Sequence, residues 1–212
     1  MSRPVRERLS QLNLNRRGIR REFYDLTIDD FKDYGSEDLE AVREFIRDYI
    51  DNIDSSFDEN KGLFLFGSNG VGKSFLASLI VKEAYRHRYT SKRVTFSEYI
   101  SEYTRVWDAK SVEEREEIES EFYNDYKAVE FLALEEVGKE IDSKISAPIL
   151  EDLLRYREDK GLVTIMCSNL EPKVLVEKYG SSIASLIKGN MTPIKIVGSD
   201  KRQEYYDERV CE

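Results

Sequence analysis

The residues best suited to chemistry form one glycine-rich run that matches the pattern G-x-x-x-x-G-K-[ST], which is typical of phosphate-binding loops. In such a loop, backbone N–H groups and the positive end of the following helix surround the β-phosphate of a nucleotide. Lys73 is expected to reach the β- and γ-phosphates, and the Ser74 hydroxyl is expected to bind Mg²⁺. The run therefore predicts a site for a nucleoside triphosphate. The predicted nucleotide-binding residues are Gly67, Ser68, Asn69, Gly70, Val71, Gly72, Lys73 and Ser74.

Three further side chains could turn phosphate binding into hydrolysis, which needs a metal ion, an oriented water molecule and positive charge near the transition state. Glu135 and Glu136 follow an apolar run, and Asn169 follows the next one. We expect Glu135 to hold Mg²⁺ through water, Glu136 to polarise the attacking water, and Asn169 to bridge that water and the γ-phosphate. By position alone, the acids could equally begin a solvated loop and Asn169 could belong to a turn. The phosphate-binding loop favours the catalytic assignment, in which Lys73 takes part.

Apolar runs alternate with helical patterns around these residues. Leu63–Phe66 predicts a buried strand directly before the loop, and 75–88 continues as a helix. Further strands are predicted at 93–96, 129–134, 162–167 and 194–197, and further helices at 36–53, 97–107, 112–126, 146–160, 172–179 and 182–188. Residues 52–61 are expected to form a polar connection. The alternation predicts an α/β fold with a parallel sheet, whose functional residues lie at the carboxyl ends of the strands.

The composition limits the class of protein. A length of 212 residues, with 40% hydrophobic and 35% charged residues, suits one domain with a substantial core. The net charge of −9 argues against a uniformly basic nucleic-acid binder, although a local basic groove is compatible with it. Two cysteines cannot build a disulfide framework, and no apolar run reaches the length of a membrane span or resembles a signal peptide. We therefore expect a cytoplasmic protein without a membrane partner.

Arginine is concentrated at the N-terminus, where residues 1–21 contain seven arginines and a single acid. This segment is interpreted either as a solvated tail or as an arm that docks on nucleic acid or on an acidic protein surface. Lys92, Arg93 and Arg105 are further candidates for nucleic-acid contact. The aromatic face of 99–107 could stack bases, but core packing is favoured.

In this order and spacing, the motifs resemble those of the AAA+ ATPases of the bacterial and phage replicative helicase loader family (DnaC/DnaI type), to which the transposition helper IstB is related. The resemblance runs from about Gly18 to Arg202. Besides the loop, it is carried by Gly18–Phe23 and Thr27–Phe31, which look like the opening of that family's core, and by three later segments. These are Leu134–Gly138, similar to the family's metal-binding segment, Thr164–Leu170, similar to its Thr-Ser-Asn-Leu strand end, and Gly198–Arg202, similar to its closing Gly-x-Asp-x-Arg.

The resemblance implies a fold, ligands and partners. The fold is a P-loop AAA+ core over residues 22–202, in which helices sandwich a five-stranded parallel sheet and no C-terminal helical lid follows. The basic arm 1–21 and a charged tail 203–212 flank it. The ligands are ATP and Mg²⁺. The implied function is the loading of a hexameric replicative DNA helicase in DNA replication, with ATP binding and hydrolysis as the assembly switch. Single-stranded DNA and self-association into a ring or spiral are further implied, in the cytoplasm of a bacterium or of the host of a phage.

Three departures from the family pattern modify these expectations. Glu135 and Glu136 stand where the family usually has two aspartates, so each carboxylate lies one methylene further out. Leu186 occupies the position of an arginine that reaches the γ-phosphate of a neighbouring subunit, so hydrolysis is expected to be weak. The candidates to replace that arginine are Lys188, Arg155 and Arg157. Only about twenty residues precede the core, so the arginine-rich arm is expected to contact the helicase.

Three other functions stay open at the level of the sequence. An IstB-like transposition helper would share the core and act with a transposase. A small P-loop nucleotide kinase also begins with a phosphate-binding loop, but the sequence shows no convincing arginine-bearing lid. A protein that binds the nucleotide without hydrolysing it would agree with the leucine at position 186.

Overall fold

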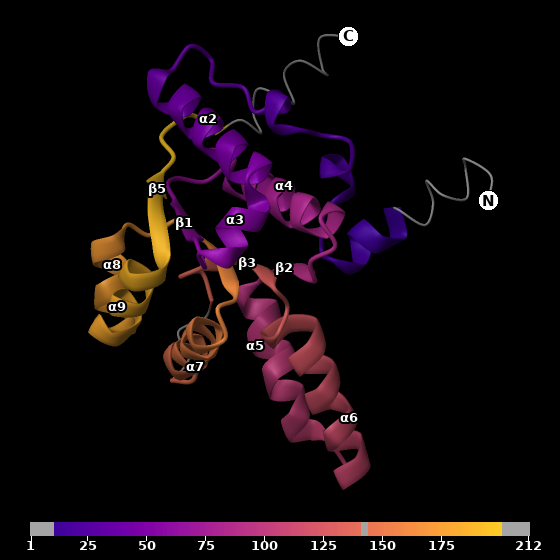
Figure 1. Ribbon diagram of the computed structural model, residues 1–212. Coiled ribbons are helices and arrows are strands. Elements are labelled where there is room, and N and C mark those ends of the chain that lie inside the picture. The colour runs from indigo at the N-terminus through magenta and orange to yellow at the C-terminus, as the bar shows by residue number, and fades with distance from the viewer. Residues whose placement is uncertain (1–10, 141–143, 201–212) are drawn as a thin grey trace, which may run out of the picture.

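A five-stranded sheet lies at the centre of the computed structural model, which describes residues 11–140 and 144–200 (Figure 1). Its strands are β1 (Gly62–Phe66), β2 (Ser91–Thr95), β3 (Phe131–Val137), β4 (Val163–Ser168) and β5 (Met191–Lys195). The strand order is β2-β3-β4-β1-β5, and every neighbouring pair is parallel. The predicted α/β fold with a five-stranded parallel sheet is confirmed. The carboxyl ends of the strands therefore share one edge of the sheet.

Helices cover both faces of this sheet (Figure 1). One face carries α2 (Glu37–Asp51), α3 (Ile53–Asp58) and α4 (Lys73–Arg86), and the other carries α5 (Phe96–Thr104), α7 (Ser146–Asp159), α8 (Pro172–Tyr179) and α9 (Ser181–Asn190). Helix α6 (Val112–Phe122) lies beside α5 and projects with it away from the sheet (Figure 1). The side chains of β1 alternate between two cores, with Leu63 and Leu65 in the first and Phe64 and Phe66 in the second. Because both faces are covered, this strand is apolar throughout.

Several element bounds differ from the predicted ones. Strand β3 continues to Val137, so Glu135 and Glu136 lie within the strand and not after it. The fifth strand is Met191–Lys195 and not 194–197, because β5 is an edge strand in which Pro193 is tolerated. The segment 52–61 is more than a polar connection, since it contains α3, of which Ile53 and Ser56 are buried.

Helix boundaries follow local capping chemistry. Ser36 caps α2 as predicted, because its hydroxyl accepts the N–H of Leu39. The second strand ends one residue early, since Thr95 and Glu98 form a capping box that starts α5 at Phe96. Helix α6 ends at Phe122 and passes into a π-helical turn over Tyr123–Lys127, whereas a single helix to 126 was predicted. The prediction of α8 over 172–179 is confirmed.

The described part of the N-terminal segment packs on the domain. Residues 11–16 are helical, and Leu14 and Ile19 are buried in the first core. Two short 3₁₀ turns follow, Arg21–Phe23 and Ile28–Asp30. The ammonium of Lys82 donates hydrogen bonds to the carbonyls of Phe23, Tyr24 and Leu26 and so fastens these turns to α4. For residues 11–21, the interpretation as a solvated tail is therefore wrong. Residues 1–10 and the predicted charged tail 203–212 lie outside the described part, and the predicted domain limits stay a prediction.

The aromatic face between β2 and α6 serves mainly the core, as favoured from the sequence. Tyr99 is buried, and Ile100 and Tyr103 pack against the second core. Phe122 of α6 meets the rings of Tyr99 and Tyr103 at 5.1 and 5.7 Å between centroids. Trp107 differs, because it is 60% exposed. Among the described residues, no helix has both the length and the apolar character of a membrane span.

Candidate nucleotide site

The phosphate-binding loop connects β1 to α4 and has a backbone that only glycine adopts easily. Gly70 and Gly72 have φ angles of 76° and 107°, in the left-handed region. A Cβ atom at Gly72 would lie 2.8 Å from Cε2 of Phe31, and one at Gly70 would lie 1.8 Å from Oδ1 of Asp200. Phe31 and Asp200 therefore form walls beside the loop, close to the N-terminus of α4.

Lys73 lies across the loop that it follows. Its ammonium donates to the carbonyl of Gly67 at 2.7 Å and to that of Ser68 at 2.5 Å. The positive charge is thereby held over the curve of the loop, at the start of α4, where the helix dipole also favours an anion. These features fit a triphosphate, and the role of Lys73 in binding it stays a prediction.

The predicted Mg²⁺ ligands Ser74 and Glu135 meet, although 61 positions separate them in the chain. The Ser74 hydroxyl donates to Oε2 of Glu135 at 2.9 Å. A hydroxyl and a carboxylate are the hard oxygen donors that Mg²⁺ prefers, and this ion commonly takes only one or two carboxylates beside the phosphates of its nucleotide. The described residues contain no larger cluster of metal-binding side chains. The pair therefore fits a nucleotide-bound Mg²⁺.

Glu135 also pairs with Arg93, which the sequence suggested as a nucleic-acid contact. Arg93 donates from Nε to Oε1 of Glu135 at 2.8 Å and from Nη2 to Oε2 at 2.5 Å. The side chains of Arg93 and Glu135 are 7% and 1% exposed. The prediction that Arg93 contacts nucleic acid is wrong, because its side chain is buried in this pair. The sequence alone carries no signal for this pairing, because it depends on β2 lying beside β3 in the sheet.

Glu136 lies next to Glu135 but points elsewhere. The pairing of β3 with β4 shifts between Leu134 and Val137, and Glu136 adopts a left-handed φ of 58°. Its exposed carboxylate pairs with Lys139 at 3.0 Å. A non-glycine residue in this region costs about 1–3 kcal/mol, and such strain clusters at functional sites. Leu134 and Val137 both lie in the second core, so the bulge adds one residue between them and leaves Glu136 exposed. The catalytic role of Glu136 stays a prediction.

Asn169 reaches the loop from the end of β4. Its Nδ2 donates to Oδ1 of Asn69 at 2.8 Å. The neighbouring Ser168 hydroxyl donates to the carbonyl of Val137 at 2.5 Å and accepts the N–H of Leu170 at 3.0 Å, which fixes the end of β4 against β3. The structure thus gathers the loop, Glu135 and Asn169 at the carboxyl edge of the sheet.

The candidates for a substitute arginine finger differ in availability. Arg157 is 1% exposed and its guanidinium donates to the hydroxyl of Thr164 and to buried main-chain carbonyls, so it cannot reach another subunit. Burial lowers its pKa. Arg155 is exposed and binds Glu151 and Ser182. Leu186 is 7% exposed and packs in the second core.

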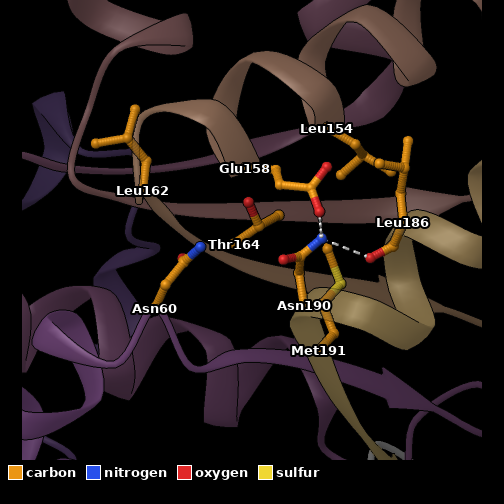
Figure 2. A pocket seen from close by; sticks show the side chains of 8 residues that line it. All are labelled: Asn60, Leu154, Glu158, Leu162, Thr164, Leu186, Asn190 and Met191. Carbon is orange, nitrogen blue, oxygen red and sulfur yellow. Dashed lines mark hydrogen bonds between the residues drawn. The ribbon is translucent and has the colours of Figure 1, made fainter.

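A small cavity at the opposite edge of the sheet is separate from this site. Figure 2 shows Asn190 inside it, donating to Oε1 of Glu158 at 2.8 Å and to the carbonyl of Leu186 at 2.9 Å. Its volume of about 10 Å³ gives room for one water molecule and no nucleotide. The cavity is lined by Asn60, Leu154, Glu158, Leu162, Thr164, Leu186, Asn190 and Met191.

No family model matches. The chain is 26% identical over 140 residues to the replicative helicase loader DnaI of Bacillus subtilis (strain 168), covering 66% of this chain and 42% of the relative. It is 25% identical over 174 residues to the replicative helicase loader DnaC of Buchnera aphidicola subsp. Acyrthosiphon pisum (strain APS), covering 80% and 66%. The matches thus span less than two thirds of these relatives.

Solved structures agree on the fold. The crystal structure of the DnaC helicase loader superposes with a TM-score of 0.70 at 19% identity, covering 84% of this chain and all of that one. The replication initiator DnaA bound to AMPPCP and single-stranded DNA superposes with a TM-score of 0.66 at 17% identity, covering 85% and 51%. The chain resembles the DnaC/DnaI-type loaders in sequence and shares the AAA+ fold. The resemblance predicted from the motifs is confirmed.

Proposed function

We propose that this chain is an ATP-dependent helicase loader in DNA replication, which binds a hexameric replicative DNA helicase in the cytoplasm. The observation that carries the proposal is the hydrogen bond between Ser74, at the end of the loop, and Glu135. It occurs in a chain whose sequence is similar to those of named helicase loaders. ATP binding is the assembly switch in this proposal, because Phe31 of the segment before α2 and Asp200 both lie against the loop that would hold the nucleotide.

Each site residue has a defined task in the proposal. Lys73 and the loop N–H groups bind the triphosphate, and Ser74 and Glu135 hold Mg²⁺, which when bound neutralises phosphate charge. Asn169 orients the attacking water beside the γ-phosphate, and Glu136 polarises it after turning away from Lys139. Hydrolysis is slow, because Leu186 is buried and Arg157 is committed to the core.

The proposal includes two further partners. Single-stranded DNA is one of them, and copies of the chain assemble into a ring or spiral. Arg105 is a candidate DNA contact, and its guanidinium pairs with Glu102 and Glu121. Lys92 is the other candidate, and its ammonium donates to the carbonyl of Arg16. A salt titration of single-stranded DNA binding tests this part, because true phosphate contacts give a steep fall in affinity with salt.

Pull-down of the replicative helicase tests the proposal directly. The tagged chain is expected to retain the helicase more strongly with ATP and Mg²⁺ than with EDTA. Lys73→Ala is expected to abolish that difference, and Lys160→Ala serves as a control, because Lys160 is exposed at the opposite edge of the sheet, before the amino end of β4. No association under either condition would contradict the loader assignment. ATP binding without helicase binding would leave a nucleotide-binding protein with another partner.

A further inference from the structure

Arg93 joins the nucleotide site to the N-terminal segment. Besides its two bonds to Glu135, its Nη1 donates to the carbonyl of Gly18 at 2.8 Å. Its main-chain N–H donates to the carbonyl of Arg17, also at 2.8 Å. One residue of β2 therefore touches a predicted Mg²⁺ ligand at one end and residues 17–18 at the other.

The contact with the N-terminal segment is close and specific. Gly18 has a φ of 75°, and a Cβ atom there would lie 2.0 Å from the carbonyl oxygen of Arg93. Only glycine allows the segment to approach β2 this closely. Since β2 is an edge strand, the bond from Arg93 to Arg17 also covers an N–H group that the sheet leaves unpaired. A movement of the Arg93 side chain is therefore transmitted to this segment.

At its other end, the Arg93 side chain shares the carboxylate of Glu135 with Ser74. Oε2 of Glu135 accepts hydrogen bonds from both Ser74 and Arg93. A cation held by Ser74 and Glu135 would share that carboxylate with the guanidinium, and two positive charges at this range repel strongly where solvent is excluded.

We propose that Arg93 is a positioning residue that holds Glu135 against Ser74 and competes with Mg²⁺ for that carboxylate. The resulting movement of the Arg93 side chain is transmitted to residues 16–18. The inference rests on the proposed ATP site and adds a route of regulation to it. Nucleotide binding then changes residues 16–18 of the arginine-rich arm, without any large movement of the sheet.

Binding of a fluorescent, non-hydrolysable ATP analogue, measured with Mg²⁺ and with EDTA, tests the charge competition. Arg93→Met is expected to raise the ratio of the two affinities by about tenfold, because Glu135 then gives its full charge to Mg²⁺ and repels the metal-free nucleotide. Lys92→Met is the matched control, since Lys92 contacts the carbonyl of Arg16 but not Glu135. An Arg93→Met ratio within twofold of the wild-type ratio would overturn the competition.

Hydrogen exchange at residues 16–19 tests the transmission to the segment. In the wild-type chain, the Mg²⁺-bound analogue is expected to change exchange there by severalfold. Arg93→Lys keeps the charge but loses the forked geometry, so it should retain the wild-type affinity ratio and lose the exchange response. If Arg93→Met does not fold, the exchange response of Arg93→Lys still tests the proposal: a response equal to that of the wild-type chain would contradict it.

The possible failures are distinguishable. If the wild-type chain binds no analogue, the proposed function falls and this inference falls with it. If the analogue binds, but residues 16–19 do not respond and Arg93→Met leaves the affinity ratio unchanged, the inference alone is wrong.

Discussion

Replacing Arg157 by methionine should destabilise the domain more than the same replacement of any exposed arginine. Arg157 donates five hydrogen bonds: to the Thr164 hydroxyl at 2.8 Å and to the carbonyls of Lys127 at 3.1 Å, Val129 at 2.8 Å, Glu130 at 3.3 Å and Val163 at 2.6 Å. Three of these carbonyls come just before β3 and that of Val163 begins β4; the carbonyl of Glu130 also accepts the main-chain N–H of Val163 at 2.9 Å. The side chain thus joins α7 to the amino ends of two core strands.

The magnitude follows from the groups that would lose their donor. Each buried acceptor left unsatisfied costs about 1–3 kcal/mol. Methionine fills a similar volume and removes the cost of burying a guanidinium, which offsets part of this loss. A net loss of ~4 kcal/mol in the free energy of unfolding is therefore expected, and it corresponds to a fall of about 8–16 °C in Tm for a domain of this size.

Urea unfolding followed by far-ultraviolet circular dichroism measures the loss. Fluorescence is a poorer probe, because the single tryptophan, Trp107, is 60% exposed and far from this contact. Arg155→Met is the matched control on the same helix, since the Arg155 side chain is 56% exposed and pairs only with groups near the surface. It should cost no more than about 1 kcal/mol. Equal losses in the two variants would refute the structural role given to Arg157.

Two other substitutions test separate parts of the structure. Gly72→Ala places a Cβ atom 2.8 Å from Phe31 at a φ of 107°, so titration calorimetry should show ATP affinity reduced by about tenfold or more; an affinity within twofold would contradict the loop geometry. Burial raises the pKa of Tyr99 and of Tyr49. The folded chain therefore keeps protons that the unfolded chain releases above about pH 10, and the free energy of unfolding should fall as pH rises beyond that value, by about 1.4 kcal/mol per pH unit for each group. Tyr99→Phe should flatten this fall, and an unchanged slope in urea titrations at pH 9 to about 11 would refute the assignment.

The sequence predicted which residues lie around the phosphate-binding loop because these residues obey local rules, while their roles stay predictions. The loop needs glycine at fixed positions, and four apolar residues before it can only be a buried strand between two helical layers. Parallel strands then bring their carboxyl ends together, so the presence of the loop favoured a position near it for Glu135 and Asn169, and the structure places both there.

What the sequence left out depends on contacts between distant segments. The pairing of Arg93 with Glu135 needs the order of β2 and β3 in the sheet, which periodicity does not reveal. The bulge at Glu136 is a tertiary effect, since neither residue type nor propensity predicts a left-handed glutamate. The N-terminal segment was misjudged because its arginines suggested solvent, whereas Leu14 and Ile19 anchor it.

Loading of the replicative helicase onto closed circular single-stranded DNA tests the central claim most directly. A closed circle admits a hexameric ring only if the ring is opened, so helicase recovered on the circle after a salt wash reports loading. The account predicts recovery that requires this chain and ATP and that is lost with Lys73→Ala. Equal recovery without this chain, or with Lys73→Ala in its place, would contradict the assignment as an ATP-dependent helicase loader.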